Sequence, residues 1–201
     1  MVKSAPLALM LFLNVLYFRV DTFLLALYKS NIDVGAYGFS YKIFEFLIAF
    51  PTFLSASIFP ILITHKNDNL KFNKKVKSYS VLLLVSAIVL SVIVFLFAPI
   101  ITVIKPDLTQ AVLPLRILSF SLPFFFLTSL FQWVILLRNK VKILIGIYAI
   151  TMLLNIFLNV LYVPTYSYVA ASIITVITEG IVFVLMLLVV TFTKAKNYGD
   201  Q

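Results

Sequence analysis

Ionisable side chains lie inside stretches of this chain that are otherwise strongly apolar. One charge at the centre of a bilayer costs about 2.5 to 3.5 kcal/mol on insertion scales, so such a side chain must be paired, hydrated or used on a substrate. Cations at this depth can bind an anionic group, and acids can couple transport to an ion or pair with a cation. The residues concerned are Arg19, Asp21, Lys42, Glu45, Arg116 and Glu179.

The composition indicates an all-α, polytopic membrane protein. The 201 residues are 63% hydrophobic with a mean hydropathy of +1.12, whereas soluble domains are about 45 to 50% apolar. Cysteine is absent and the single histidine, His65, lies in a lysine-rich loop, so we expect no metal site and no cofactor. The net charge of +9 does not indicate nucleic-acid binding, because the lysines lie in short loops between apolar segments.

The apolar segments predict a single bundle of six transmembrane helices over residues 1–201. A spanning helix needs about 20 predominantly apolar residues, and charges or helix breakers separate the segments that qualify. Arg19 and Asp21 interrupt the first segment, which argues against a cleaved secretory signal. The predicted spans are about 5–28, 36–63, 78–104, 111–137, 142–163 and 168–193.

Lysine and arginine gather in alternate loops, which predicts the orientation. Loops 65–77 and 138–142 and the two chain ends are basic, whereas the connections near residues 31, 107 and 165 carry few cations. Because basic loops stay on the cytoplasmic side, we expect both termini to face the cytoplasm in a multi-pass protein of the cytoplasmic (plasma) membrane.

Polar residues recur at helical spacing within the spans. Asn155 and Asn159 lie one turn apart in the fifth span, and Thr175 and Glu179 do so in the sixth. Such stripes either hydrogen-bond between helices or line a wet cavity. With the charged residues included, they predict a hydrated pocket in the outer half of the membrane with Glu179 at its floor. Cysteines at positions 155, 159 and 175 should then be accessible from outside.

The spacing of the charges limits their local pairing. Lys42 and Glu45 are three residues apart, so they either pair on one helix face or act on a substrate, whereas Arg19 and Asp21 point to nearly opposite sides. Glu179 either pairs with Arg19 or Lys42 or holds a proton, which proton coupling requires.

The cations suit an anionic substrate. Arginine binds phosphate oxygens through a planar fork, and lysine acts as a point charge. Arg116 either contributes to such binding or extends to the membrane interface. The sequence therefore predicts substrate binding by Arg19, Lys42, Arg116, Asn155 and Asn159, and ion coupling or charge pairing by Asp21, Glu45 and Glu179.

Three stretches resemble a known family. They are YFRVDTFLLALYKSNIDVGAYGFSYKIFEFLIAFPTFLSASIFPIL (17–62), LRILSFSLPFFFLTSLFQWVILLRNK (115–140) and LNIFLNVLYVPTYSYVAASIITVITEG (154–180). They are similar to the polysaccharide and O-antigen flippases of the multidrug/oligosaccharidyl-lipid/polysaccharide exporter superfamily. The R-x-D of Arg19 and Asp21, the V-G-x-Y of 34–37, Glu45, and Pro51 and Pro60 carry the first match.

The resemblance implies a transporter that moves polyprenyl-pyrophosphate-linked oligosaccharide to the outer leaflet by alternating access. It covers the order of motifs in the second half of such proteins, so it implies one half of a two-bundle transporter. The partners implied are the lipid-linked anionic oligosaccharide, membrane lipids, and a second six-span bundle, supplied by a homodimer or by a separate amino-terminal half.

The sequence also bears on three other function classes. A multidrug or small-molecule exporter is the nearest alternative, although three intramembrane cations argue against it. A non-transporting accessory subunit stays open. A membrane glycosyl or acyl transferase is disfavoured because the chain has no D-x-D motif and no cysteine or intramembrane histidine, so we expect no enzyme.

Overall fold

The computed structural model describes residue 12 and residues 19–192 of the chain, and all regular structure in this part is helical. This confirms the all-α fold class. Residues 19–28 form the first continuous helical stretch, here called helix 19–28. The elements that follow are α2 (Asn31–Thr64), α3 (Asn69–Phe97), α4 (Ile100–Ile104), the 3-10 helix η1 (Pro106–Ala111), α5 (Val112–Ser119), α6 (Leu122–Leu137) and α7 (Val141–Phe192).

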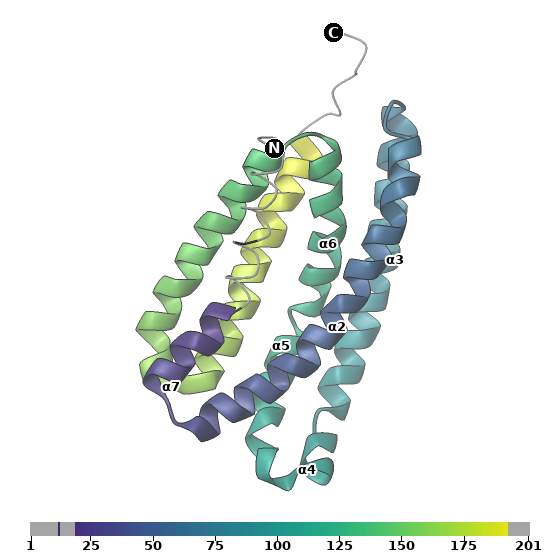
Figure 1. Ribbon diagram of the computed structural model, residues 1–201. Helices are drawn as coiled ribbons and strands as arrows, with labels where there is room; N and C mark the ends of the chain where they lie inside the picture. The colour runs from purple at the N-terminus through teal and green to yellow at the C-terminus, as the bar shows by residue number, and fades with distance from the viewer. Residues whose placement is uncertain (1–11, 13–18, 193–201) are drawn as a thin grey trace.

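Three of the described helices, α2, α3 and α7, are each long and apolar enough to cross a membrane. A fourth span is present if Pro106–Ser119 and Leu122–Leu137, which meet at 50°, cross together. The 52 residues of α7 would measure about 78 Å as one straight helix. That is more than twice the hydrocarbon thickness of about 30 Å, and α7 instead folds back on itself (Figure 1). The number of six spans stays a prediction.

The reversal of α7 occurs at Ser167, whose backbone has φ 53° and ψ −140°. Pro164 lies three residues earlier and lacks the N–H that would bond the preceding turn. Residues 141–166 are here called the first arm of α7, and residues 168–192 the second arm. The two arms run antiparallel (Figure 1).

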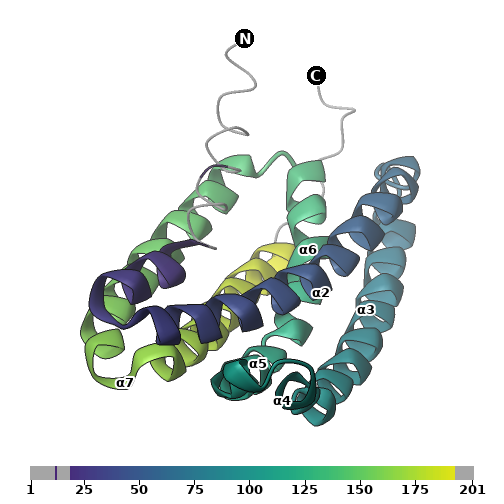
Figure 2. The same cartoon turned by 60° about the horizontal axis from the view of Figure 1, so that its bottom comes forward.

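Helix α6 lies at the centre of the packing. It contacts α2, α3 and α7, and Figure 2 shows it between α3 and the arms of α7. Its Phe126, Leu130 and Val134 are fully buried. By contrast, α3 leaves most of its large apolar side chains exposed, as suits a helix that faces lipid.

Serine hydroxyls occupy the bend between α5 and α6. In lipid, a free carbonyl finds no water and must be satisfied by the protein. Ser91 of α3 donates to the Ser119 carbonyl at 2.7 Å, and Ser121 donates to the Leu118 carbonyl at 2.6 Å. Ser40 of α2 similarly donates to the Ala111 carbonyl at 2.6 Å, where η1 ends. These serines therefore allow the chain to bend at membrane depth.

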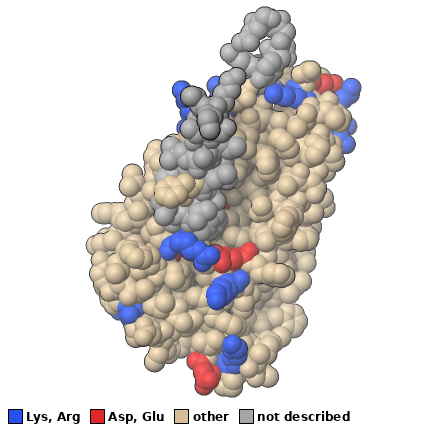
Figure 3. All heavy atoms as spheres, in the orientation of Figure 1, with Lys and Arg blue, Asp and Glu red and all other residues tan. Residues whose placement is uncertain are grey.

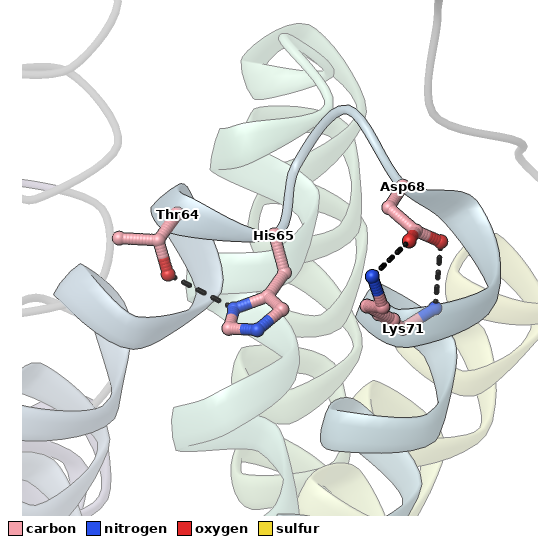
Figure 4. A network of polar contacts seen from close by, with 4 residues as sticks. All are labelled: Thr64, His65, Asp68 and Lys71. Atoms are coloured by element: carbon pink, nitrogen blue, oxygen red, sulfur yellow. Dashed lines mark hydrogen bonds and ion pairs between the residues drawn. The ribbon is translucent and has the colours of Figure 1, made fainter.

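The turn between α2 and α3 is shorter than the predicted loop 65–77, because α3 begins at Asn69. Asp68 caps this helix by accepting from the Lys71 backbone N–H at 3.0 Å, and it pairs with the Lys71 ammonium at 3.1 Å (Figure 4). His65 Nδ1 lies 2.9 Å from Thr64 Oγ1. Most lysines of this region therefore project from the first turns of α3.

Asp68 gives the start of α3 a pH dependence. The Lys71 backbone N–H, followed by the Lys71 side chain, lowers the pKa of Asp68 below its ordinary value of 3.8. The stabilisation is complete above that ordinary value and is lost as the pH falls through the lowered pKa. We expect Asp68→Ala to reduce the hydrogen-exchange protection of the first turn of α3 at neutral pH, and the difference from wild type to shrink once Asp68 is protonated.

Asp68→Asn is the matched control, because it keeps a capping oxygen without a titratable group. Its protection in the first turn should not change with pH over the same range. An identical pH response in Asp68→Asn and wild type would show that Asp68 is not the titrating group.

The positive φ at Ser167 predicts a stabilising substitution. A non-glycine residue in such a region costs about 1 to 3 kcal/mol, whereas glycine loses about 0.5 to 1 kcal/mol through its flexibility. Ser167→Gly should therefore stabilise the protein by about 1 kcal/mol and raise its thermal midpoint in detergent. Ser57→Gly is the control, because Ser57 lies in regular helix and its hydroxyl donates to the Phe53 carbonyl of the same helix. This variant should lower the thermal midpoint. A lower midpoint for Ser167→Gly would contradict the strained geometry.

Candidate functional site

Asp21 lies at the junction of helix 19–28, α2 and both arms of α7. Its side chain is 2% exposed. Asn159 Nδ2 donates to its Oδ1 at 2.8 Å, the Tyr37 hydroxyl donates to Oδ2 at 3.3 Å, and Thr175 Oγ1 lies 2.6 Å from Oδ2. Within residues 19–192, no basic side chain forms an ion pair with this carboxyl group. Its hydrogen-bond partners among the described residues are therefore all neutral.

The contacts continue along α7. Asn159 Nδ2 also lies 2.9 Å from the Asn155 carbonyl and 3.0 Å from Asn155 Oδ1, while Asn155 Nδ2 donates to Thr178 Oγ1 at 3.4 Å. These side chains are almost completely buried. We call the connected set the Asp21 network, which comprises Asp21, Tyr37, Asn155, Asn159, Thr175 and Thr178.

The Asp21 network has more oxygen atoms than donors can satisfy. The amide nitrogen of Asn159 has two hydrogens but three acceptors within 3.0 Å. Its own Oδ1 is buried and has no hydrogen-bond partner in the described part of the chain. A carboxylate and several amide and hydroxyl oxygens form a donor set of the kind that hard cations prefer. This arrangement suits a small monovalent cation.

The Asp21 network also suits a proton. Thr175 Oγ1 carries one hydrogen but lies within reach of two acceptors, Asp21 Oδ2 at 2.6 Å and the Ala171 carbonyl at 3.0 Å. When Asp21 is ionised, the threonine donates to it. When Asp21 is protonated, the acid can donate to Thr175, which then donates to Ala171. Thr175 can therefore form a hydrogen bond with Asp21 in either protonation state.

Glu179 lies one turn beyond Thr175 on the second arm of α7 and is 3% exposed. Thr128 of α6 donates to its Oε1 at 2.8 Å. Glu179 is thus a second buried acid. It belongs to α7, which also contributes to the Asp21 network, and it contacts α6. Arg19, one of the two cations that the sequence offered as partners of Glu179, pairs with Glu45.

Arg19, Lys42 and Glu45 lie on the outside of the bundle and are here called the charged face. Arg19 Nη2 and Glu45 Oε1 are 3.0 Å apart, with side chains 61% and 30% exposed, and Lys42 is exposed. Figure 3 shows basic and acidic side chains together in the middle of one largely uncharged surface. Of the two alternatives that the sequence left open for Glu45, pairing with Lys42 is thus not the contact seen, since Glu45 pairs with Arg19 of another helix. Arg19 and Asp21 face opposite ways, as their spacing predicts.

Arg116 does not join the charged face. Its Nε donates to the Phe95 carbonyl of α3 at 3.2 Å, and its guanidinium carbon lies 5.1 Å from the centroid of the Phe95 ring. These two contacts hold the Arg116 guanidinium against α3. The structure therefore separates Arg116 from the other two predicted substrate-binding cations.

The polar residues expected to line an open, hydrated pocket are buried in the described part of the structure. Asp21, Asn155, Asn159 and Glu179 are buried among hydrogen-bonding side chains. Three grooves formed by described residues are lined almost entirely by apolar side chains, and none of the predicted site residues lines them. Positions 155, 159 and 175 are therefore closed to solvent in this conformation.

The sequence alone did not indicate a site role for Tyr37, Thr128 or Thr178. Tyr37 was visible as part of the V-G-x-Y motif, and its full burial explains why an aromatic residue with a hydroxyl is useful there. Thr128 lies beside Ser129, and Thr178 lies beside Glu179 and three residues after Thr175. Nothing in their spacing separates them from threonines that bond only their own helix.

A buried carboxyl group among helices that can cross a membrane is characteristic of membrane transporters. The chain belongs to the MatE family, whose family model matches residues 6–161. This membership supports the multidrug/oligosaccharidyl-lipid/polysaccharide exporter superfamily and identifies a multi-pass membrane transporter. No curated protein and no solved structure matches the chain.

The charged face and the Asp21 network should differ in chemical accessibility. The chain has no native cysteine, so each introduced thiol reports alone. Maleimide reacts with the thiolate, which needs water to form. We expect Lys42→Cys to react rapidly with a membrane-impermeant maleimide, and Asn159→Cys to react slowly because it is buried.

Val85→Cys on α3 is the control, because Val85 is 56% exposed but lies on an apolar helix that we expect to face lipid. It should also react slowly. If Lys42→Cys reacts no faster than Val85→Cys, the charged face does not border an aqueous space. Rapid reaction of Asn159→Cys would contradict the closed network.

Proposed function

We propose that this chain provides one helical bundle of an ion-coupled exporter that moves a lipid-linked, negatively charged oligosaccharide across the cytoplasmic membrane by alternating access. Membership of the MatE family supports membrane export in general. The observation that carries the proposal is the buried Asp21 carboxyl, whose hydrogen-bond partners within residues 19–192 are neutral and which lies two residues from the exposed Arg19.

Asp21 is the proposed ion-coupling residue. An uncompensated carboxylate in a low-dielectric interior is unfavourable, so binding a proton or a monovalent cation stabilises it there. The carboxyl contacts α2 and both arms of α7, so the charge on one group alters the packing of three segments. Asn155 and Asn159 then belong to the ion site rather than to the substrate site expected from the sequence.

The charged face is the proposed contact for substrate. Arg19 presents an exposed planar fork and Lys42 a point charge, and these are the groups that bind phosphate oxygens. Glu45 holds Arg19 in place at 3.0 Å until a pyrophosphate competes for the guanidinium. The polyprenyl tail would stay in the bilayer, and a second bundle would complete the passage.

A multidrug exporter is the second candidate. The pairing of Arg19 with Glu45 leaves Lys42 as the cation of the charged face without an acidic partner in residues 19–192, and Arg116 lies elsewhere. A face with so little excess positive charge also suits amphipathic organic cations, which Glu45 could bind. An accessory role beside a separate transporting chain is the remaining alternative.

Flipping in proteoliposomes tests the proposal. The full-length protein is reconstituted with a fluorescent polyprenyl-pyrophosphate oligosaccharide, and transfer between leaflets is followed under an imposed pH or sodium gradient. A charge-assisted hydrogen bond contributes about 1.5 to 3 kcal/mol, so loss of one phosphate contact should reduce flipping at least about tenfold. We expect this loss in Arg19→Ala and Lys42→Ala. Asp21→Asn should flip at a rate that no longer depends on the gradient.

Matched controls separate function from folding. Asp33→Asn alters a partly exposed carboxylate that contacts Ser30 near the start of α2, and Lys140→Ala alters a loop cation. Both should retain gradient-driven flipping. Wild-type rates in the double variant Arg19→Ala/Lys42→Ala would overturn the substrate assignment. Transport of a cationic dye without transport of the lipid would support the multidrug alternative.

A further inference from the structure

A long apolar groove runs between α2 and α3. It consists of one cavity of about 570 Å³ and one of about 290 Å³, and both are lined by Leu47 and Ile93. The two cavities therefore adjoin at these residues, and we call the pair the α2–α3 groove. The buried Phe126 lines the larger cavity and the buried Leu115 the smaller one. The groove is thus backed by packed side chains.

The dimensions of the α2–α3 groove match a hydrocarbon tail. Its walls extend along α2 from Phe39 to Phe53, which corresponds to about 21 Å of helix. One leaflet is about 15 Å deep, half of the hydrocarbon thickness. Ser86 is the one polar residue lining the larger cavity, and its hydroxyl already donates to the Leu82 carbonyl at 2.8 Å. An occupant of this part needs no polar group.

Lys105 lies at one end of the groove, in the connection between α4 and η1. Its Nζ is 5.5 Å from the centroid of the Phe39 ring, so the cation lies beside the apolar wall. Among residues 19–192 it forms no ion pair with a carboxylate. A cation at the end of an apolar groove complements a molecule with one anionic group and a long apolar tail.

We propose that the α2–α3 groove binds an anionic phospholipid of the surrounding bilayer, with its phosphate at Lys105 and one acyl chain along α2. The net charge of +9 favours an anion over a second copy of the same chain. A protein helix would fill the apolar length but would leave Lys105 without a counter-charge. This inference does not depend on the transported substrate, because Arg19, Lys42 and Asp21 do not line the groove.

Native mass spectrometry of the full-length protein in detergent tests the proposal. Phosphatidylglycerol and phosphatidylcholine with the same acyl chains serve as probes. One basic residue near a membrane surface contributes about 1 kcal/mol toward an anionic lipid. We therefore expect about fivefold tighter binding of phosphatidylglycerol, and loss of this preference in Lys105→Gln. Leu47→Trp, which fills the point where the two cavities meet, should weaken both lipids.

Lys105 is exposed, so Lys105→Gln keeps the test informative even if Leu47→Trp does not fold. Lys29→Gln, in another sparsely charged connection, is the matched control and should retain the preference. Equal binding of the two lipids by wild type would overturn the proposal, as would an unchanged preference in Lys105→Gln. A dimer that Leu47→Trp dissociates without changing lipid binding would instead identify an interface between copies.

Discussion

The need to satisfy the buried carboxyl of Asp21 shapes the arrangement of the helices. A charge without compensation in an apolar interior is strongly unfavourable, and Asp21 has no cation beside it in the described part of the chain. Its carboxyl oxygens instead form hydrogen bonds with Tyr37 of α2, Asn159 of the first arm of α7 and Thr175 of the second arm. These segments must approach one point, so the reversal of α7 and the position of helix 19–28 depend on each other.

The same constraint explains many polar residues that have no proposed part in transport. Ser40, Ser91 and Ser121 lie at membrane depth because the chain bends there and exposes carbonyl groups that lipid cannot solvate. Arg138, at the end of α6, similarly donates to the Val190 carbonyl at 2.5 Å. A polar residue in a span is therefore evidence of a site only when its partners are side chains from other segments, as they are around Asp21.

The spacing of residues along a helix predicted which side chains share a face. It did not predict which side chains meet between helices. The three- and four-residue steps predicted that Asn155 and Asn159 share a helix face, and their side chains lie 3.0 Å apart, from Asn159 Nδ2 to Asn155 Oδ1. The same rule suggested Lys42 for Glu45, but Arg19 lies closer in space although it is 26 residues away in sequence. Pairing across helices depends on how they pack, which a pattern along one segment does not contain. The bend between α5 and α6 could not be predicted for the same reason.

The two-residue spacing of Arg19 and Asp21 offers a mechanical link for the proposed exporter. Residues two apart point to nearly opposite sides of a helix, so helix 19–28 carries a buried acid on one side and an exposed cation on the other. When an ion neutralises Asp21, its contacts with α2 and α7 change strength, and any movement of the short helix alters the distance from Arg19 to Glu45. Ion binding then changes how firmly Glu45 holds the guanidinium. By linkage, a substrate that withdraws Arg19 from Glu45 must in turn change the affinity of Asp21 for its ion.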